Sequence, residues 1–325
     1  MKRLDVAVVG YGVMGKYHAS VYSAMPQTNL VAVVDPLANR RDEAQAEYAV
    51  AAFEDVDAML SRRKIAAATV SAPTSVHARL TEKLLRAGVH VLVEKPAATS
   101  VNQAEYLASL SRRLGLILQV GHITRFYQAV QLLASRVTSP YLIEARRLTP
   151  NSRIKDVGVI LDLMIHDIDI VLGLVAGDIT DVTVAGHIIN GSPFEDVAAA
   201  QITFSSGCIA RFLASRIAPD AERTLVVAES ERTFRLDFGK EPHTEMTVYR
   251  PKASSDGNLV QMDRTVVHEE NPLRKELEHF LARIHGTTPP IGTLDDDLRS
   301  LRLAARLLAR LAPTRRADAL GAASY

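Results

Sequence analysis

The chain has 325 residues, of which 47% are hydrophobic and 23% are charged. This composition is ordinary for a globular protein and excludes disorder across the whole chain. Lysine and arginine (38) nearly balance aspartate and glutamate (37), so no overall basic field draws the protein onto nucleic acid or anionic lipid. The length suits two domains better than a single core.

Cysteine content and hydropathy indicate where the protein works. Cys208 is the single cysteine, which excludes an internal disulfide bond and a zinc site built on cysteine pairs. The apolar run near the N-terminus has only about six residues, too few for a signal-peptide core. No stretch approaches the roughly 20 apolar residues that span a bilayer. We therefore expect a cytoplasmic protein with neither a membrane nor a nucleic acid as its partner.

Strands and helices alternate along the first third of the chain. β-Branched runs are separated by helical patterns that close on glycines such as Gly88 and Gly115. The expected strands lie at residues 4–9, 30–34, 68–73, 89–96 and 116–122. This alternation predicts a doubly wound parallel sheet, an α/β domain of the Rossmann type over residues 1–122.

The predicted pattern of secondary structure changes near residue 141, where short strands are joined by turns with few helices between them. The expected strands lie at residues 182–189, 197–204, 208–214, 223–229, 232–238 and 246–250. Two helical segments, at about 273–286 and 295–312, close the chain. This pattern predicts an α+β domain with an open, mostly antiparallel sheet over residues 123–325.

A glycine-rich turn follows the first expected strand. Gly10 permits the turn, Gly12 lets the backbone approach a pyrophosphate at a helix N-terminus, and Gly15 allows the helix to pack closely on the strand. Asp35 ends the second strand and would bind the ribose hydroxyls and repel a 2′-phosphate, which favours NAD over NADP. Arg40 and the adjacent arginine at 41 are nearby cations that could instead serve a 2′-phosphate. A glycine turn that binds nothing is the alternative.

The strand at 89–96 ends in Glu94-Lys95-Pro96. Ligands of a parallel sheet sit beyond the carboxyl ends of its strands, so Lys95 is expected at the edge of an active site.

Residues 160–172, ILDLMIHDIDIVL, are apolar apart from one histidine and three aspartates. On a helix, Asp162, His166 and Asp169 fall within about 60° of one another, whereas Asp167 lies on the far side. A carboxylate four residues before a histidine can orient the ring as a base. The alternatives are a buried pair that satisfies itself and a metal shared by the two side chains. We expect no metal, and we expect Asp167 to pair with an arginine from a neighbouring element.

Three stretches, GYGVMGKYHA, PTSVHARLTEKLLRAGVHVLVEKP and GVILDLMIHDIDIVLGL, resemble the Gfo/Idh/MocA oxidoreductases. The resemblance implies an NAD- or NADP-dependent enzyme that oxidises or reduces a sugar or cyclitol carbinol. It also implies a homo-oligomer, a dimer or tetramer, built through the open sheet. The family's catalytic lysine falls on Lys95, its aspartate and histidine on Asp162 and His166, and its frequent cis proline on Pro96. Met164 departs from the glycine common before the histidine.

The resemblance also suggests which residues line the two binding sites. Those expected to bind NAD are Gly10, Tyr11, Gly12, Val13, Met14, Gly15, Asp35, Pro73, Thr74, His77, Glu94 and Lys95. Those expected to bind the substrate are His122, Arg125, Arg153, Lys155, Asp162 and His166. Further cations lie at 146 and 147. Together these cations could bind a diphosphate group of the substrate, since arginine forks match phosphate oxygens.

The segments GH-x-x-RF and DLMIHDID are similar to those of the branch that acts on nucleotide sugars such as UDP-N-acetylglucosamine. An enzyme of that branch would make a 3-keto sugar for a later aminotransferase, on a route to the 2,3-diamino sugars of lipid A. His166 would be the base, oriented by Asp162, and Lys95 would hold the carbinol oxygen. The alternatives are a free-sugar or inositol dehydrogenase with the same catalytic groups and a non-catalytic NAD-sensing regulatory protein.

Overall fold

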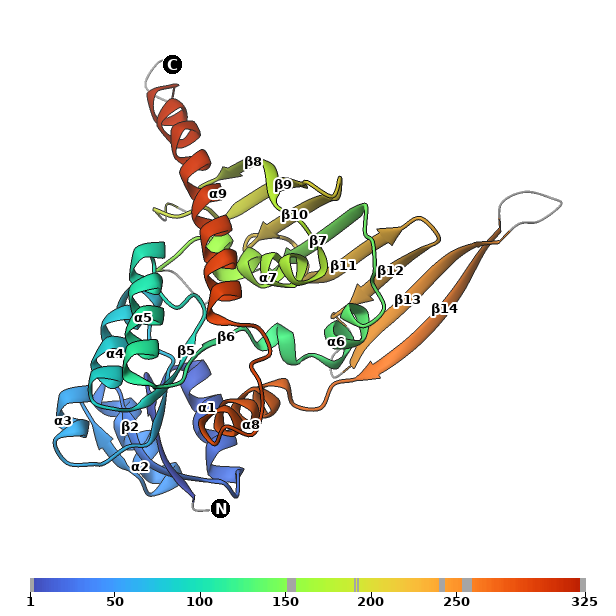
Figure 1. Cartoon of the computed structure of the whole chain (residues 1–325). Coiled ribbons are helices and arrows are strands. Elements are labelled where there is room, and N and C mark those ends of the chain that lie inside the picture. Colours follow the sequence, from blue (N-terminus) through green and yellow to red (C-terminus); the bar gives the residue numbers. More distant parts are fainter. Residues whose placement is uncertain are drawn as a thin grey trace. The chain divides into compact units, whose positions relative to one another are not determined.

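The computed structural model describes residues 3–150, 156–189, 191, 193–239, 243–252 and 259–321 (Figure 1). The chain forms two compact units. The first unit comprises Met1–Ile123 and Asn271–Leu298, and the second comprises Thr124–Glu270 and Arg299–Tyr325. No helix in the described part of the chain is both long and apolar enough to cross a membrane.

The first unit holds a six-stranded sheet in the order β3-β2-β1-β4-β5-β6. All neighbouring strands are parallel, so the doubly wound parallel sheet expected from the sequence is confirmed. The strands are β1 (Leu4–Val9), β2 (Thr28–Val34), β3 (Ala51–Phe53), β4 (Ala67–Val70), β5 (His90–Glu94) and β6 (Leu118–Gly121). Strand order reverses between β1 and β4, the place where parallel sheets of this kind bind their ligands.

The helices of the first unit follow the strands along the chain. They are α1 (Val13–Ala24), α2 (Ala38–Tyr48), α3 (Val56–Leu60), α4 (Thr74–Arg86), α5 (Val101–Leu114) and α8 (Pro272–Ile284). Helix α8 was expected in the second domain, and this assignment needs correction. Its residues Leu273, Leu277, Phe280 and Leu281 lie in one buried cluster with Tyr22 of α1 and strand residues of the parallel sheet. Burying each such side chain stabilises by about 1.5–3 kcal/mol, which fixes α8 to the first unit.

The second unit is built on an eight-stranded sheet in the order β14-β13-β12-β11-β7-β10-β9-β8. The strands are β7 (Leu142–Leu148), β8 (Ile179–His187), β9 (Val197–Phe204), β10 (Ile209–Ser215), β11 (Glu222–Glu229), β12 (Arg232–Asp237), β13 (His243–Lys252) and β14 (Leu259–His268). Only the β7–β10 pairing among the described strands is parallel, so the mostly antiparallel sheet is confirmed. Figure 1 shows β13 and β14 as a long hairpin that extends beyond the other strands of this sheet.

The two faces of the second sheet differ in what covers them. The helical segments of this unit are η1 (Ile123–Phe126), α6 (Gln128–Ala134), η2 (Ile160–Met164), α7 (Ile165–Leu174) and the later part of α9 (Leu294–Gly321). Segment η2 packs against β10. The other face is hollowed and lined by residues of six strands, among them Arg146, Gln201 and Arg211. Since side chains alternate along a strand, Arg146 and its neighbour Arg147 belong to opposite faces.

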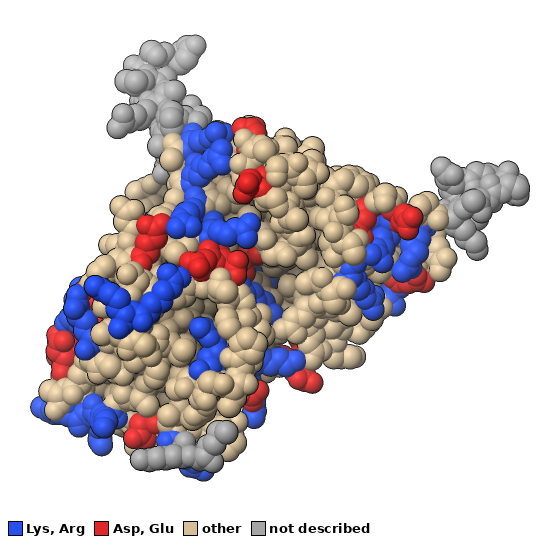
Figure 2. All heavy atoms as spheres, in the orientation of Figure 1, with Lys and Arg blue, Asp and Glu red and all other residues tan. Residues whose placement is uncertain are grey.

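Charge is distributed in both signs over the face drawn in Figure 2, with blue atoms gathered over α9. In this helix Arg310 lies 3.6 Å from Asp181 of β8. An exposed pair of this kind contributes little to stability, about 0–1 kcal/mol.

Candidate functional site

The glycine turn at the end of β1 brings helix α1 tightly against the strand. Gly10 has a φ of +93°, a conformation that side chains rarely adopt. A Cβ atom on Gly15 would lie 1.9 Å from the carbonyl oxygen of Gly10, so only glycine fits there. A Cβ on Gly12 would meet only the Nη1 atom of Arg40, at 3.9 Å. Packing within the described protein therefore leaves space beside Gly12, at the N-terminus of α1, where a dinucleotide pyrophosphate fits.

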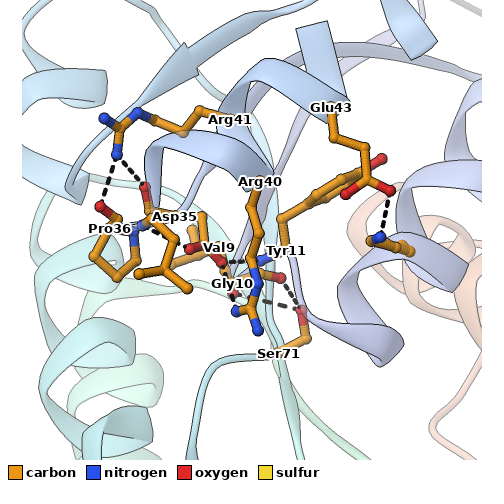
Figure 3. Close-up of polar contacts among 11 residues, drawn as sticks. Val9, Gly10, Tyr11, Asp35, Pro36, Arg40, Arg41, Glu43 and Ser71 are labelled. Carbon is orange, nitrogen blue, oxygen red and sulfur yellow. Dashed lines mark hydrogen bonds and ion pairs between the residues drawn. The ribbon is translucent and has the colours of Figure 1, made fainter. Parts of the chain in front are cut away.

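Asp35 follows β2 and is almost fully buried beside this turn (Figure 3). Its Oδ2 accepts a hydrogen bond from the Tyr11 backbone at 2.8 Å, and its Oδ1 accepts one from Leu37 at 2.9 Å. Arg40 approaches Oδ2 with its Nη1 at 3.2 Å. Arg41 is turned away and donates to the carbonyl oxygens of Asp35 and Pro36, both at 2.8 Å. A fixed carboxylate at this place suits the ribose hydroxyls of NAD, and Arg40 is the nearer of the two arginines.

Four more of the residues expected to bind NAD lie at two helix N-termini. Val13 and Met14 open α1, and Thr74 opens α4 directly after Pro73. Both helices follow the neighbouring strands β1 and β4, between which the strand order reverses. The cluster as a whole therefore has the polarity and the position of a dinucleotide site.

The Glu94-Lys95-Pro96 segment ends β5 with a cis peptide bond between Lys95 and Pro96, as expected. Buried His77 places its Nδ1 2.8 Å from the Pro96 carbonyl oxygen and its Nε2 2.7 Å from the Ala72 carbonyl oxygen. Two carbonyl acceptors require two N–H donors, so both contacts are hydrogen bonds only when the ring is doubly protonated. His77 thus ties the segment that carries Lys95 to the turn before α4.

Glu94 forms a buried pair with His18 of α1. His18 Nε2 lies 2.8 Å from Glu94 Oε1, and the side chains are 0% and 14% exposed. Burial alone would raise the pKa of Glu94, but the hydrogen bond from His18 and the charges of His18, Lys95 and His77 lower it overall. The carboxylate next to Lys95 is therefore held in its charged form.

Replacing His18 by leucine is expected to destabilise the protein by about 3–5 kcal/mol at pH 7, because Glu94 would remain buried without its partner. A carboxyl group whose pKa is lowered on folding stabilises the fold above its unfolded pKa. That contribution is lost as the pH falls through the folded pKa. The difference between the two proteins in urea unfolding should therefore shrink when the titration is repeated in acid.

The adjacent exposed residue Tyr17, which is 55% exposed, provides a matched control. Tyr17→Leu should stay within about 0.5 kcal/mol of the parent protein. Equal stability of the His18→Leu and parent proteins at pH 7 would refute the assigned role of the pair.

The polar stripe of the second unit begins in a π-helical turn. Residues Ile160–Met164 form η2, and the regular helix α7 starts only at Ile165. Residues 160–172 were expected to form one α-helix, so the angle expected between Asp162 and His166 needs correction. A wider turn holds Asp162, which is buried, whereas His166 is half-buried in the first turn of α7. Single π-type turns of this kind are frequent at functional sites.

Asp169 and Arg125 form a two-point ion pair. Arg125 donates from Nε to Oδ2 at 2.8 Å and from Nη2 to Oδ1 at 2.5 Å. The hydroxyl of Ser300 donates to the same carboxylate at 3.0 Å. Asp169 thus fixes Arg125, one of the residues expected to touch the substrate.

Asp167 faces away from that stripe and pairs with Arg147 of β7. The two hydrogen bonds run from Nε to Oδ2 at 3.0 Å and from Nη2 to Oδ1 at 2.7 Å, which confirms the expected arginine partner. Arg146 instead pairs with Glu222 at 3.0 Å and lines the hollow on the other face. The expectation that Arg146 and Arg147 share one pocket is therefore wrong, because strand alternation separates them.

His122, Arg153 and Lys155 were also expected to bind the substrate. His122 is buried in the first unit, with its Nε2 3.8 Å from Oδ1 of Asp297. Arg153 and Lys155 lie outside the described residues.

Comparison with known proteins decides the family. The model described as "Oxidoreductase family, NAD-binding Rossmann fold" matches residues 4–122, and the GFO/IDH/MocA C-terminal domain matches residues 129–235. The chain belongs to the GFO/IDH/MocA family. It is therefore an NAD-dependent oxidoreductase, in agreement with the cofactor that the glycine turn and Asp35 favour.

Several GFO/IDH/MocA proteins are similar over most of their length. UDP-N-acetylglucosamine 3-dehydrogenase from Acidithiobacillus ferrooxidans is 32% identical over 293 residues, 89% of this chain and 91% of that protein. The solved structure of that enzyme has a TM-score of 0.86 and 30% identity, covering 96% of this chain and 98% of the other. The scyllo-inositol 2-dehydrogenase (NAD(+)) from Bacillus subtilis is 30% identical over 309 residues, 89% of each chain.

Two polar residues of this GFO/IDH/MocA member escaped the sequence analysis. His18 lies on the buried face of α1, where a polar residue is itself a signal, but its partner Glu94 is 76 positions away. Arg223 of β11 is the register partner of Arg147, and this became visible only with the strand pairing. Met164, at the position where the family resemblance leads one to expect glycine, is buried within η2.

Proposed function

We propose that the protein oxidises the 3-hydroxyl of UDP-N-acetylglucosamine to a 3-keto sugar and passes the hydride to NAD. The similarity to the UDP-N-acetylglucosamine 3-dehydrogenase, 32% identical across 89% of the chain, is the observation that carries this proposal. The glycine turn and the buried Asp35 support the cofactor. By the family resemblance, the catalytic positions fall on Lys95, Asp162 and His166, which supports catalysis over a purely sensory role.

Oxidation of a secondary alcohol requires a proton acceptor and a positive charge near the oxygen. A secondary alcohol is a poor acid, so a base must take its proton while a cation stabilises the oxyanion that develops. In our proposal His166 takes the proton, Asp162 orients its ring, and the Lys95 ammonium holds the oxygen. Bound NAD supplies the acceptor for the hydride that leaves carbon.

The positions that support Lys95 give this assignment a structural basis within the first unit. Glu94 is kept charged by His18, and His77 bonds to the Pro96 carbonyl on the other side of Lys95. Half-buried Lys95 therefore follows and precedes fixed residues, which limits the motion of the segment that carries it.

A free-sugar or inositol dehydrogenase is the second candidate, since the scyllo-inositol 2-dehydrogenase is 30% identical over 89% of the chain. The 3-keto product of the first candidate would serve an aminotransferase on the way to 2,3-diamino sugars such as those of lipid A. We also propose a homo-oligomer assembled through the hollowed face of the second sheet.

A substrate panel separates the candidates. UDP-N-acetylglucosamine, free N-acetylglucosamine, glucose and inositols are offered with NAD or NADP, and the reduced cofactor is followed by absorbance. We expect turnover with the UDP-sugar and NAD. Turnover confined to a free sugar or an inositol would replace our proposal by the second candidate. An absence of turnover with every substrate would favour a non-catalytic, NAD-sensing regulatory protein.

A further inference from the structure

Two arginines of the second unit are direct neighbours across paired strands. Arg147 of β7 and Arg223 of β11 are register partners, so their side chains leave the same face of the sheet. Both lie on the face opposite Arg146. Like charges at such positions repel, and a protein that keeps them together needs negative charge close by.

Asp167 supplies one negative charge and forms an ion pair with Arg147. The two bonds between them use both carboxylate oxygens, and the side chains are only 12% and 8% exposed. A two-point pair of this geometry is close to neutral as a unit. Asp167 also attracts Arg223 electrostatically, but both of its oxygens are bonded to Arg147. Within the described part of the chain, Arg223 has no carboxylate of its own.

Aromatic rings, and no carboxylate among the described residues, hold Arg223. Its guanidinium carbon lies 4.8 Å from the Tyr127 ring centroid and 4.4 Å from that of Phe238. The two rings are perpendicular, with centroids 6.0 Å apart. Nη1 donates to the Tyr127 hydroxyl at 3.2 Å, which fixes the plane of the fork.

Part of the fork is left without a protein acceptor. The Nε–H of Arg223 is buried and has no hydrogen-bond partner within the described part of the chain. Burial and the neighbouring charge of Arg147 lower the pKa of Arg223, although an arginine stays protonated. An oriented cation with an unused donor is costly unless a ligand supplies the missing anion.

We propose that Arg223, held by Tyr127 and Phe238 beside Arg147, forms an anion subsite that binds a phosphate group of the substrate. A planar guanidinium fork matches the oxygens of a phosphate in two-point fashion, and its aromatic support reduces the entropy lost on binding. That this phosphate belongs to the diphosphate of a UDP-sugar rests on the proposed function.

The test compares Arg223→Met with the parent enzyme, using UDP-N-acetylglucosamine and the methyl glycoside of N-acetylglucosamine. Losing a charged hydrogen bond should raise KM for the UDP-sugar by roughly 10- to 100-fold, with little change in kcat. The uncharged glycoside should show no such change. Arg274→Met, which changes an exposed arginine of α8, is the matched control and should leave KM as it was. An unchanged KM for the UDP-sugar in Arg223→Met would overturn the proposal.

Binding of inorganic pyrophosphate is measured in parallel by calorimetry, with NAD saturating so that the glycine turn is filled. We expect heat of binding with the parent protein and its loss in Arg223→Met. Arg223→Lys keeps the charge without the fork and should bind pyrophosphate at least several-fold more weakly; it replaces Arg223→Met in both assays if that variant melts early. Equal binding by parent and variant overturns the subsite.

The two measurements also separate this subsite from the proposed function. If no UDP-sugar is turned over but pyrophosphate binding depends on Arg223, the function is wrong and the subsite stands. If the UDP-sugar is turned over and neither KM nor pyrophosphate binding responds to Arg223, the function stands and the subsite is wrong.

Discussion

Replacing His166 by alanine is expected to lower kcat by roughly 10²- to 10⁴-fold, the contribution of a positioned general base. The half-buried ring stands in the first turn of α7, next to the π-helical turn that carries Asp162. Removing the ring should leave the fold and the binding of NAD intact, because the glycine turn and Asp35 belong to the first unit. Turnover of the UDP-sugar at saturating NAD is the measurement.

Added imidazole offers a readout that a purely structural role would not show. If the missing group is a proton acceptor, free imidazole should restore part of the rate of His166→Ala. His187→Ala, which removes an exposed histidine of β8, is the control and should retain full activity. Unchanged kcat in His166→Ala would remove His166 from the mechanism.

Replacing Asp35 by alanine is expected to raise KM for NAD by roughly 10- to 100-fold, since hydrogen bonds to a charged group are lost. The same change removes the negative charge that repels a 2′-phosphate and releases Arg40, which lies 3.2 Å from the carboxylate. The ratio of kcat/KM for NADP to that for NAD should therefore increase. Initial rates with both cofactors measure it.

A second variant shows which arginine is responsible for the gain. Adding Arg40→Ala to Asp35→Ala should remove the improvement with NADP, because Arg40 is the cation nearest to the carboxylate. Adding Arg41→Ala should not, since Arg41 bonds to the backbone oxygens of Asp35 and Pro36. A parent enzyme that already prefers NADP would contradict the role given to Asp35.

Local patterns predicted the parallel sheet well, because its buried strands are short β-branched runs separated by glycine stops. The antiparallel character of the second sheet also followed from closely spaced strands and turns. Strands β3, β7 and β14 were not predicted. Of these, β3 has only the three residues Ala51–Phe53, which leave little signal. Helix α8 was assigned to the wrong unit, because its apolar face predicts that the helix packs against a core but does not identify which unit provides that core.

In the candidate site, too, local sequence patterns predicted some features and missed others. Spacing within one segment was enough to single out the glycine turn, Lys95 and the polar positions at 162 and 166. It also predicted that Asp167 pairs with an arginine but not that Arg147 is the one. The contacts of His18 with Glu94 and of Arg223 with Tyr127 join segments 76 and 96 positions apart, which no local pattern contains. The π-helical turn at Ile160–Met164 was likewise not predicted.

The position of hydride transfer tests the central claim most directly. UDP-N-acetylglucosamine that carries deuterium on C3 is incubated with the enzyme and NAD, with a hydrazine present to trap the ketone. The reduced nicotinamide is then analysed by mass spectrometry. We expect deuterium in the reduced cofactor and a trapped 3-keto sugar. Reduced cofactor without deuterium, or a ketone trapped at another carbon of the sugar, would contradict oxidation at the 3-hydroxyl.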